Sequence, residues 1–488
     1  GSSSESHVLP PSAAAPSSRT SPAGRYFFYM SAEKRFKIPE VRGVLRVGTG
    51  DPITHVDCAS PCKRIELTRQ ALAQGIAAIG GVGQGKTFLC SKILQNMKVP
   101  YKLLTFAPKT DLVKYLPHKE VLFVPRAPPN VGRTFRWNIF LEAYLAERVF
   151  RLMPAEQVFL EFFSSLAKGD ERTGNWVRLA AQIIAGVALY LYRRARLVIG
   201  VGNHPADYLP TNQELLEMLM SRDDIVARAY DYLLSEKRPE YAPILAALES
   251  YLRAPRGTEM ASSYETTMSM VLMHLTGTGF ANDGRDAFLL LRPDMKKYEL
   301  EEIDAVYLYL ADLSEGLKSA ISAMIQTALR LLFKSYEAER MDVPLIVFLD
   351  DFSTIPFIPI LADLPNIGRA VGMWTMVTGQ YVKQLTDYGG KYILGAFGVQ
   401  FYFPTADAET RKHVAEIIAA LEPKLGLLRR AGAEDVAKAG RVDASVAELE
   451  TGTAYIVLAA ALGGGKRSVA KVRLYRTKPS FFDLLKRL

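Results

Sequence analysis

Cysteine and long apolar runs are both scarce in this sequence. Three cysteines in 488 residues cannot form the disulfide framework of a small secreted scaffold, which favours a reducing compartment. The longest apolar run, residues 179–192, contains Gln182 and is shorter than the roughly 18–20 residues that span a bilayer. We interpret it as a buried core helix. No internal repeat is found, so the chain is not read as a repeat array.

Cys58 and Cys62 are four residues apart, with Pro61 between them and no second ligand pair nearby in the sequence. Metal sites built on cysteine pairs need such a second pair. We therefore do not predict a metal site there, and the role of these two cysteines stays open.

The composition is that of a folded protein, with 49% hydrophobic and 10% aromatic residues. A chain of this length has room for two or three domains. The net charge of +9 suits a nucleic acid or an anionic membrane as partner, although an ordinary solvated surface would also account for it.

The first 24 residues are rich in Ser, Ala and Pro and lack apolar periodicity, so we expect residues 1–24 to be disordered. The first four residues, Gly-Ser-Ser-Ser, resemble a sequence left over from cloning. We expect the natural chain to begin earlier, which leaves an upstream membrane anchor as an open alternative.

Short apolar runs alternate with helical patterns in residues 25–143. Strands are predicted at 76–79, 101–106 and 121–124, with a helix after the first of them. This alternation is typical of a mostly parallel sheet. We assign residues 25–143 to the first part of an α/β nucleotide-binding domain.

Helical periodicity replaces the alternation in residues 144–276. Apolar residues recur at spacings of three and four, and Pro and Gly lie mainly between the periodic stretches. The predicted helices are 156–167, 176–194, 212–220, 223–235 and 243–253. We interpret residues 144–276 as an all-α domain inserted between two halves of the α/β domain.

The α/β alternation returns in residues 277–478. Strands are predicted at 305–310, 345–349, 374–378 and 400–403, with a long helix at 316–337. Two late strands at 454–461 and 470–475 are expected to be antiparallel. Residues 479–488 are assigned to a C-terminal tail.

One segment of the first part fits the phosphate-loop pattern G-x-x-x-x-G-K-[ST] at every fixed position. Its residues are Gly80, Gly81, Val82, Gly83, Gln84, Gly85, Lys86 and Thr87. In the predicted strand–loop–helix context, successive backbone N–H groups surround a polyphosphate and the helix N-terminus adds partial positive charge. Lys86 would neutralise the β/γ oxygens of ATP, and the Thr87 hydroxyl would ligate Mg²⁺. The alternative is a Gly-rich turn with an incidental lysine.

An acidic pair follows the apolar strand 345–349. Nucleotide hydrolysis needs a carboxylate for Mg²⁺ and a group that positions the attacking water, both at the carboxyl end of a buried strand. Asp350 would hold Mg²⁺, directly or through water, and Asp351 would polarise the water. The alternative is a strand that ends in a solvated acidic turn.

Two further polar residues flank the strand 374–378. Gln380 follows the strand and could sense the γ-phosphate, whereas Arg369 precedes it and could act as an arginine finger on a neighbouring subunit. Their ordinary alternatives are a helix-capping amide and a surface arginine.

In this combination the chain resembles the type IV secretion coupling proteins, the TraG/TraD-like ATPases of conjugation and effector secretion. The resemblance covers about residues 75–475. Three motifs in the first part of the chain carry the resemblance: residues 80–87 match the phosphate loop, residues 106–111 resemble the family's D-P-K-G-E turn, and Trp137-Asn138 stands where the family has an asparagine before a proline. Three more follow in the second part: residues 349–352 match the family's D-E-F strand end, residues 368–372 resemble its R-G-x-G segment, and residues 380–385 resemble its Q-S-x-x-Q-L segment.

The resemblance implies a RecA-like P-loop NTPase core with an inserted all-α domain. It further implies a homo-hexamer with ATP and Mg²⁺ at subunit interfaces, where Lys86, Thr87, Asp350, Asp351 and Gln380 come from one subunit and Arg369 from its neighbour. The cargo would be DNA, secreted protein or both. Implied partners are relaxosome or effector adaptor proteins and secretion-channel components, at the cytoplasmic face of the bacterial inner membrane. This chain itself would be soluble, and a monomer without the anchor is the alternative.

The chain departs from the family at Asp351, where the family has glutamate, and at Tyr381, where it has serine. The shorter Asp351 keeps open a nucleotide-binding cargo receptor with little hydrolysis. An FtsK/HerA-like DNA translocase is a further alternative, although a long helical insert between the motifs is not expected there.

Overall fold

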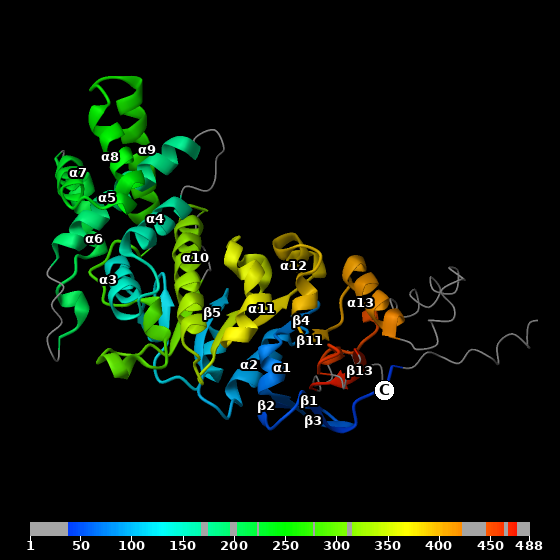
Figure 1. The fold of residues 1–488 in the computed structure, drawn as a ribbon. Helices are drawn as coiled ribbons and strands as arrows, with labels where there is room; N and C mark the ends of the chain where they lie inside the picture. The colour runs from blue at the N-terminus through cyan, green and yellow to red at the C-terminus, as the bar shows by residue number, and fades with distance from the viewer. Residues whose placement is uncertain are drawn as a thin grey trace, which may run out of the picture. The chain divides into compact units, whose positions relative to one another are not determined.

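The structure is a computed structural model that describes residues 38–166, 174–195, 203–221, 224–276, 279–309, 315–421, 446–462 and 467–475 (Figure 1). The predictions for residues 1–24 and 479–488 lie outside these ranges. Residues 39–488 form one compact unit, to which the following description applies. In the described ranges, no helix combines the length and the apolar character that crossing a membrane requires.

The larger sheet has ten strands among the described residues, in the order β13-β12-β11-β4-β10-β9-β5-β8-β6-β7. The strands from β11 to β7 pair in parallel, and β12 and β13 extend the sheet in antiparallel fashion. Their bounds are β4 Ile76–Ile79, β5 Lys102–Ala107, β6 Leu122–Val124, β7 Arg133–Thr134, β8 Ala305–Tyr309, β9 Leu345–Leu349, β10 Met373–Gly379, β11 Val399–Tyr402, β12 Thr453–Leu458 and β13 Ser468–Arg473.

The central strands are buried along their whole length, as expected for a parallel sheet covered on both faces. Every residue of β4, β9 and β10 is buried. The predictions for 76–79 and 345–349 are confirmed to the residue, and the antiparallel pairing of the two late strands is confirmed as well. The predicted strand 454–461 is three residues too long at its end.

Helices cover this sheet. Their bounds are α1 Arg69–Ala73, α2 Lys86–Gln95, α10 Glu315–Ala338, α11 Pro359–Val371, α12 Val382–Gly389 and α13 Ala408–Leu421. α2 begins directly at the phosphate loop, and α11 connects β9 to β10. The long helix predicted at 316–337 corresponds to α10, which packs against α11 and also against the helical segment described below.

A three-stranded sheet, which the sequence did not predict, precedes α1. It consists of β1 (Gly43–Val47), β2 (Pro52–Asp57) and β3 (Cys62–Thr68) in the order β1-β3-β2. Its buried residues, among them Val56 and Leu67, share one hydrophobic core with residues of α2 and β4. The small sheet therefore supports the elements on either side of the phosphate loop.

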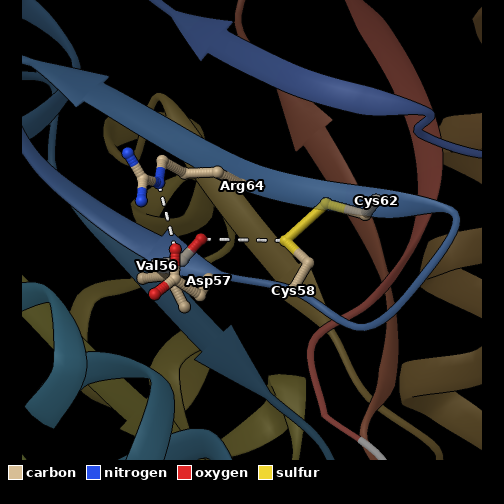
Figure 2. Close-up of a disulfide and its surroundings, with 5 residues drawn as sticks. All are labelled: Val56, Asp57, Cys58, Cys62 and Arg64. Atoms are coloured by element: carbon tan, nitrogen blue, oxygen red, sulfur yellow. Dashed lines mark hydrogen bonds and ion pairs between the residues drawn. A yellow bond between two sulfur atoms is a disulfide. The ribbon is translucent and has the colours of Figure 1, made fainter.

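A disulfide joins Cys58 and Cys62 across the turn between β2 and β3 (Figure 2). Their Cα atoms are 5.3 Å apart, a separation typical of disulfides. Asp57 pairs with Arg64 in the register of the two strands, and Arg64 Nε donates to Asp57 Oδ1 at 3.0 Å. The hairpin thus brings the cysteines together. The low cysteine count did not exclude one such local pair.

Residues between β7 and β8 form a helical segment. Its helices are α3 Ile139–Tyr144, η3 Leu145–Val149, α4 Ala155–Leu166, α5 Gly174–Arg194, α6 Asn212–Ser221, α7 Ile225–Ser235, α8 Ala242–Arg253 and α9 Glu259–Thr276. α5 contacts α4, α6, α7, α8 and α9, so it lies at the centre of the segment. It contains the apolar run 179–192, which is a helix with many buried residues, as predicted. α9 is a further helix that was not predicted. The assignment of residues 144–276 as a separate domain stays a proposal.

The chain enters and leaves the helical segment at one place. Trp137 and Asp286 form a parallel bridge, in which Asn138 N–H donates to Asp286 O at 2.8 Å. The Asn138 side chain caps α3, since its Oδ1 accepts from the N–H groups of Phe140 and Leu141. Its Nδ2 donates to Gly284 O at 3.1 Å. One buried asparagine therefore ties the outgoing and the returning chain together.

Glu142, which is fully buried, makes a second connection at this junction. Its carboxylate accepts from Trp137 Nε1 at 2.7 Å and from the N–H groups of Phe288 and Leu289 at 2.7 and 2.9 Å. Burial raises the pKa of Glu142 to about 7, although these three donors act in the opposite direction.

Candidate functional site

The phosphate loop lies at the carboxyl edge of the parallel sheet, between the ends of β10 and β11. Gly80 N–H donates to Gly379 O at 3.1 Å, and Gly81 N–H donates to Pro404 O at 2.8 Å. A Cβ on Gly80 would come within 2.5 Å of Phe403 Cβ, so only glycine fits there. The start of the loop is thereby fixed on both sides by backbone contacts.

The rest of the loop turns outward and back into α2. Val82 is 76% exposed at the tip, next to Gly83. Gly85 is the N-cap of α2 and has φ +100°, in the left-handed region that glycine adopts without strain. The strand–loop–helix context predicted from the sequence is confirmed.

Lys86 reaches back across the loop. Its Nζ donates to Gly80 O at 2.8 Å and to Gly81 O at 2.7 Å, and the residue is only 9% exposed. Burial lowers the pKa of Lys86, whereas the charges of Asp351 and Asp350 raise it. The ammonium therefore lies inside the loop and close to both carboxylates.

The predicted Mg²⁺ ligands lie in contact with each other. Thr87 Oγ1 donates to Asp350 Oδ1 at 2.7 Å, although 263 positions separate them in the sequence. Asp350 is 6% exposed, and its N–H donates to Phe106 O at 2.8 Å. Burial raises the pKa of Asp350, and hydroxyl donors from Thr378 and Thr87 oppose that shift.

These oxygens fit Mg²⁺. The ion prefers hard oxygen ligands and is usually held by one or two carboxylates together with substrate phosphates and water. Thr87 and Asp350 supply a hydroxyl and a carboxylate beside the loop. Within the described ranges, no cluster of three or more His, Cys, Asp or Glu side chains could hold a metal ion by itself.

Thr378, the residue before Gly379 at the end of β10, is a site residue that sequence reasoning missed. Its Oγ1 donates to Asp350 Oδ1 at 2.7 Å and accepts from Asp351 N–H at 2.8 Å. One hydroxyl thus orients both members of the acidic pair. The only signal in the sequence was a threonine at the end of a buried strand.

Asp351 has a left-handed backbone, with φ +52°. Aspartate adopts this conformation more readily than longer side chains, because its short carboxylate can bond locally. Here Asp351 Oδ1 accepts from Ser353 Oγ at 2.8 Å, and the residue is half-buried. The structure places Asp351 beside Asp350 at the loop, and its part in positioning water stays a prediction.

Gln380 and Arg369 lie at opposite edges of the sheet. Gln380 follows β10 next to Gly379, the residue that accepts from the phosphate loop, and its N–H donates to Gln384 Oε1 at 2.8 Å. Arg369 is exposed near the end of α11, and its guanidinium donates to Gln74 Oε1 at 3.3 Å. The seven residues of β10 separate the two edges by about 20 Å. One chain therefore does not bring Arg369 to its own loop, and an arginine finger acting on a neighbour stays a prediction.

A parallel sheet with a phosphate loop after one strand and a carboxylate after a nearby strand, in contact with the loop threonine, defines the class of RecA-like P-loop nucleotide-binding folds. No family model and no curated protein matches this sequence.

Solved structures of the plasmid coupling protein TrwB share the fold. The unbound monoclinic form of TrwBdeltaN70 has a TM-score of 0.56 at 17% identity, over 88% of this chain and 90% of that chain. The complex with the non-hydrolysable ATP analogue ADPNP has a TM-score of 0.55 at 17% identity, over 88% and 91%. The complex with ADP and Mg²⁺ has 0.53 at 16%, over 88% and 91%. The predicted α/β RecA-like fold, as found in coupling proteins, is confirmed.

Proposed function

We propose that this chain is an Mg²⁺-dependent ATPase that acts as a coupling protein of a bacterial type IV secretion or conjugation system. The observation that carries the proposal is the contact of Thr87 Oγ1 with Asp350 Oδ1, at 2.7 Å, beside a phosphate loop in a coupling-protein fold. The TrwB complexes with ADP and Mg²⁺ and with ATP and GTP analogues support ATP as substrate and Mg²⁺ as cofactor.

Each residue of the site has a distinct role in this proposal. The loop N–H groups and Lys86 bind the phosphates, and Thr87 and Asp350 hold the Mg²⁺, which neutralises charge on the phosphate oxygens when it is bound. Asp351 orients the attacking water, and Gln380 contacts the γ-phosphate. Arg369 of a second copy in a homo-hexamer reaches the site from outside and stabilises the charge that develops in the transition state.

The cargo is DNA, secreted protein or both, recruited from relaxosome or effector adaptor proteins and passed toward the secretion channel. The site of action is the cytoplasmic face of the inner membrane. The net charge of +9 agrees with a polyanionic cargo, and DNA binding through phosphates would weaken steeply as salt increases. A salt-insensitive or absent interaction with DNA would favour protein as the cargo.

ATP turnover in the presence of Mg²⁺, with and without DNA, tests this function. Lys86→Ala is expected to abolish turnover, because it removes the buried ammonium between the loop carbonyls. The matched control is Lys63→Ala, an exposed lysine on β3 outside the site. Turnover that survives in Lys86→Ala would contradict the assigned site.

A cargo receptor that binds nucleotide with little hydrolysis is the second candidate. The observation that favours the receptor is the short Asp351 side chain, whose carboxylate accepts a hydrogen bond from Ser353. If the protein is such a receptor, the Asp351→Glu variant should hydrolyse ATP faster than the wild type. A wild type that already hydrolyses ATP, at a rate that DNA stimulates, would instead support the ATP-driven coupling protein. The FtsK/HerA-like translocase has less support, because a long helical segment separates the two nucleotide motifs.

A further inference from the structure

The phosphate loop follows β4, and different strands lie on the two sides of β4. On one side, β10 and β9 end in Gln380 and Asp350. On the other side, β11 is followed by β12 and β13 (Figure 1). Two antiparallel pairings make β13 run in the same direction as β4, so its end reaches the same edge of the sheet. Tyr475 lies there, two residues beyond the last residue of β13.

Tyr475 packs directly on the loop. Its phenol donates to the carbonyl oxygen of Gln84. The ring occupies the volume that a Cβ on Gly85 would take, so the glycine required by the phosphate-loop pattern also makes room for this ring. Tyr475 contacts Phe88 edge-to-face, with ring centroids 5.6 Å apart and an interplanar angle of 71°.

Phe88 comes directly after Thr87 in the first turn of α2, and it is 40% exposed. Tyr115 contacts the same ring edge-to-face, with centroids 6.4 Å apart. Lys92 Nζ lies 5.5 Å from the Phe88 centroid and 5.2 Å from the Tyr115 centroid. A partly exposed aromatic ring, in contact with two other rings and with the Lys92 ammonium over it, therefore lies next to the predicted Mg²⁺ ligand Thr87. The phosphate chemistry assigned above makes no use of it.

We propose that the exposed part of the Phe88 ring receives the nucleobase of the bound nucleoside triphosphate by stacking, and that Tyr475 is the positioning residue for this ring and for the loop. The inference rests on the function proposed above. Lys86 and Asp350 set the γ-phosphate end of the site on the β9–β10 side. The phosphate chain then follows the loop N–H groups toward the first turn of α2. We place the ribose and base at Phe88, one residue beyond Thr87 and in contact with Tyr475 and Tyr115.

Stacking on an aromatic ring tolerates any base, because every base has a π face. The chemical class of ligand is therefore a nucleoside triphosphate, without selection for its base. We expect MgATP and MgGTP to bind with similar affinity and to depend equally on Phe88.

Calorimetric titration of the whole chain with MgATP, MgGTP and Mg-tripolyphosphate separates base from phosphate binding. Phe88→Ala should raise the dissociation constants of both nucleotides about 5- to 150-fold, the range for loss of one stacked base, and should leave tripolyphosphate binding unchanged. Phe88→Trp should retain nucleotide binding. The control is Tyr392→Ala, which removes an aromatic ring that is 77% exposed and precedes β11 at the opposite edge of the sheet.

Tyr475→Phe keeps the ring and removes the donor to Gln84. It should weaken all three ligands by the same factor, about 2- to 10-fold for one hydrogen bond. If this variant weakened the nucleotides alone, or left all three affinities unchanged, the role of Tyr475 in positioning the loop would be wrong. Phe88→Ala with wild-type nucleotide affinity, or with equal loss of nucleotides and tripolyphosphate, would overturn the stacking assignment while the proposed function stands. A wild type that binds none of the three ligands would instead overturn the proposed function.

Discussion

Replacing Thr378 by valine tests whether one hydroxyl organises the acidic pair. Valine has nearly the shape of threonine and lacks its oxygen. The change removes the donor to Asp350 Oδ1 and the acceptor for Asp351 N–H, both in hydrogen bonds of 2.7–2.8 Å. Thr378 is 1% exposed, so water cannot readily replace the missing oxygen.

The size of the effect follows from these two bonds. A hydrogen bond to a charged group contributes about 1.5–3 kcal/mol, and a buried N–H left without a partner costs about 1–3 kcal/mol. The added methyl group offsets part of this by its burial. We expect a net loss of about 2–4 kcal/mol in the free energy of unfolding. Changing a residue that hydrogen-bonds to a metal ligand typically costs about 10- to 100-fold in metal affinity or activity, so the Mg²⁺ concentration for half-maximal ATP turnover should rise by that factor.

The same strand offers a matched control. Thr375 is also buried, and its Oγ1 has no hydrogen-bond partner among the described residues. Thr375→Val should therefore leave both stability and Mg²⁺ dependence unchanged or slightly improve stability. Chemical denaturation and Mg²⁺ titration of turnover would be measured on both variants. If Thr378→Val kept the wild-type Mg²⁺ dependence, or if the two variants behaved alike, the proposed organising role would be refuted.

Two further predictions concern Glu142 and Arg369. The pKa of Glu142 is about 7 in the folded chain against 4.5 for the ordinary group, so its contribution to stability is complete below pH 4.5 and is lost as the pH rises through 7. The stability difference between wild type and Glu142→Gln should therefore shrink by about 2 kcal/mol between pH 5 and pH 8, as measured by chemical denaturation, and a difference that grew with pH would contradict the sign. Arg369→Ala should abolish turnover in a homogeneous assembly, and mixing it with Asp350→Ala subunits should restore part of the activity, because some interfaces then combine an intact site with an intact arginine. Absence of recovery in the mixture would count against an arginine finger.

The parts of the site that were predictable from the sequence are those whose chemistry lies in one short segment. The phosphate loop is one contiguous motif, and the strands around Ile76 and Leu345 are continuous apolar runs with turn residues after them. Asp350 could be placed opposite Thr87 because carboxyl ends of parallel strands meet at one edge. Thr378 could not be recognised, since its role depends on two hydrogen bonds across separate strands.

Other features could not be predicted, because they depend on contacts between residues that are far apart in the sequence or in unpredicted strands. Tyr475 reaches the loop only because β12 and β13 extend the sheet from its far side. The disulfide of Cys58 and Cys62 depends on the hairpin between β2 and β3, whose strands were not predicted. Arg369 lies at the edge of the sheet away from its own loop, so the predicted arginine finger requires a second chain, about which one sequence contains no direct signal.

The bridge between Trp137 and Asp286 has a consequence for how such a chain can be rebuilt. Bridged residues of neighbouring strands lie about 5 Å apart, so the two ends of the helical segment are nearly in contact. A segment inserted between adjacent points of a folded scaffold can be exchanged without rerouting the rest of the chain. α10 also packs against α4 and α9, so a graft of another helical segment at this junction would have to preserve the surface that these helices present to α10.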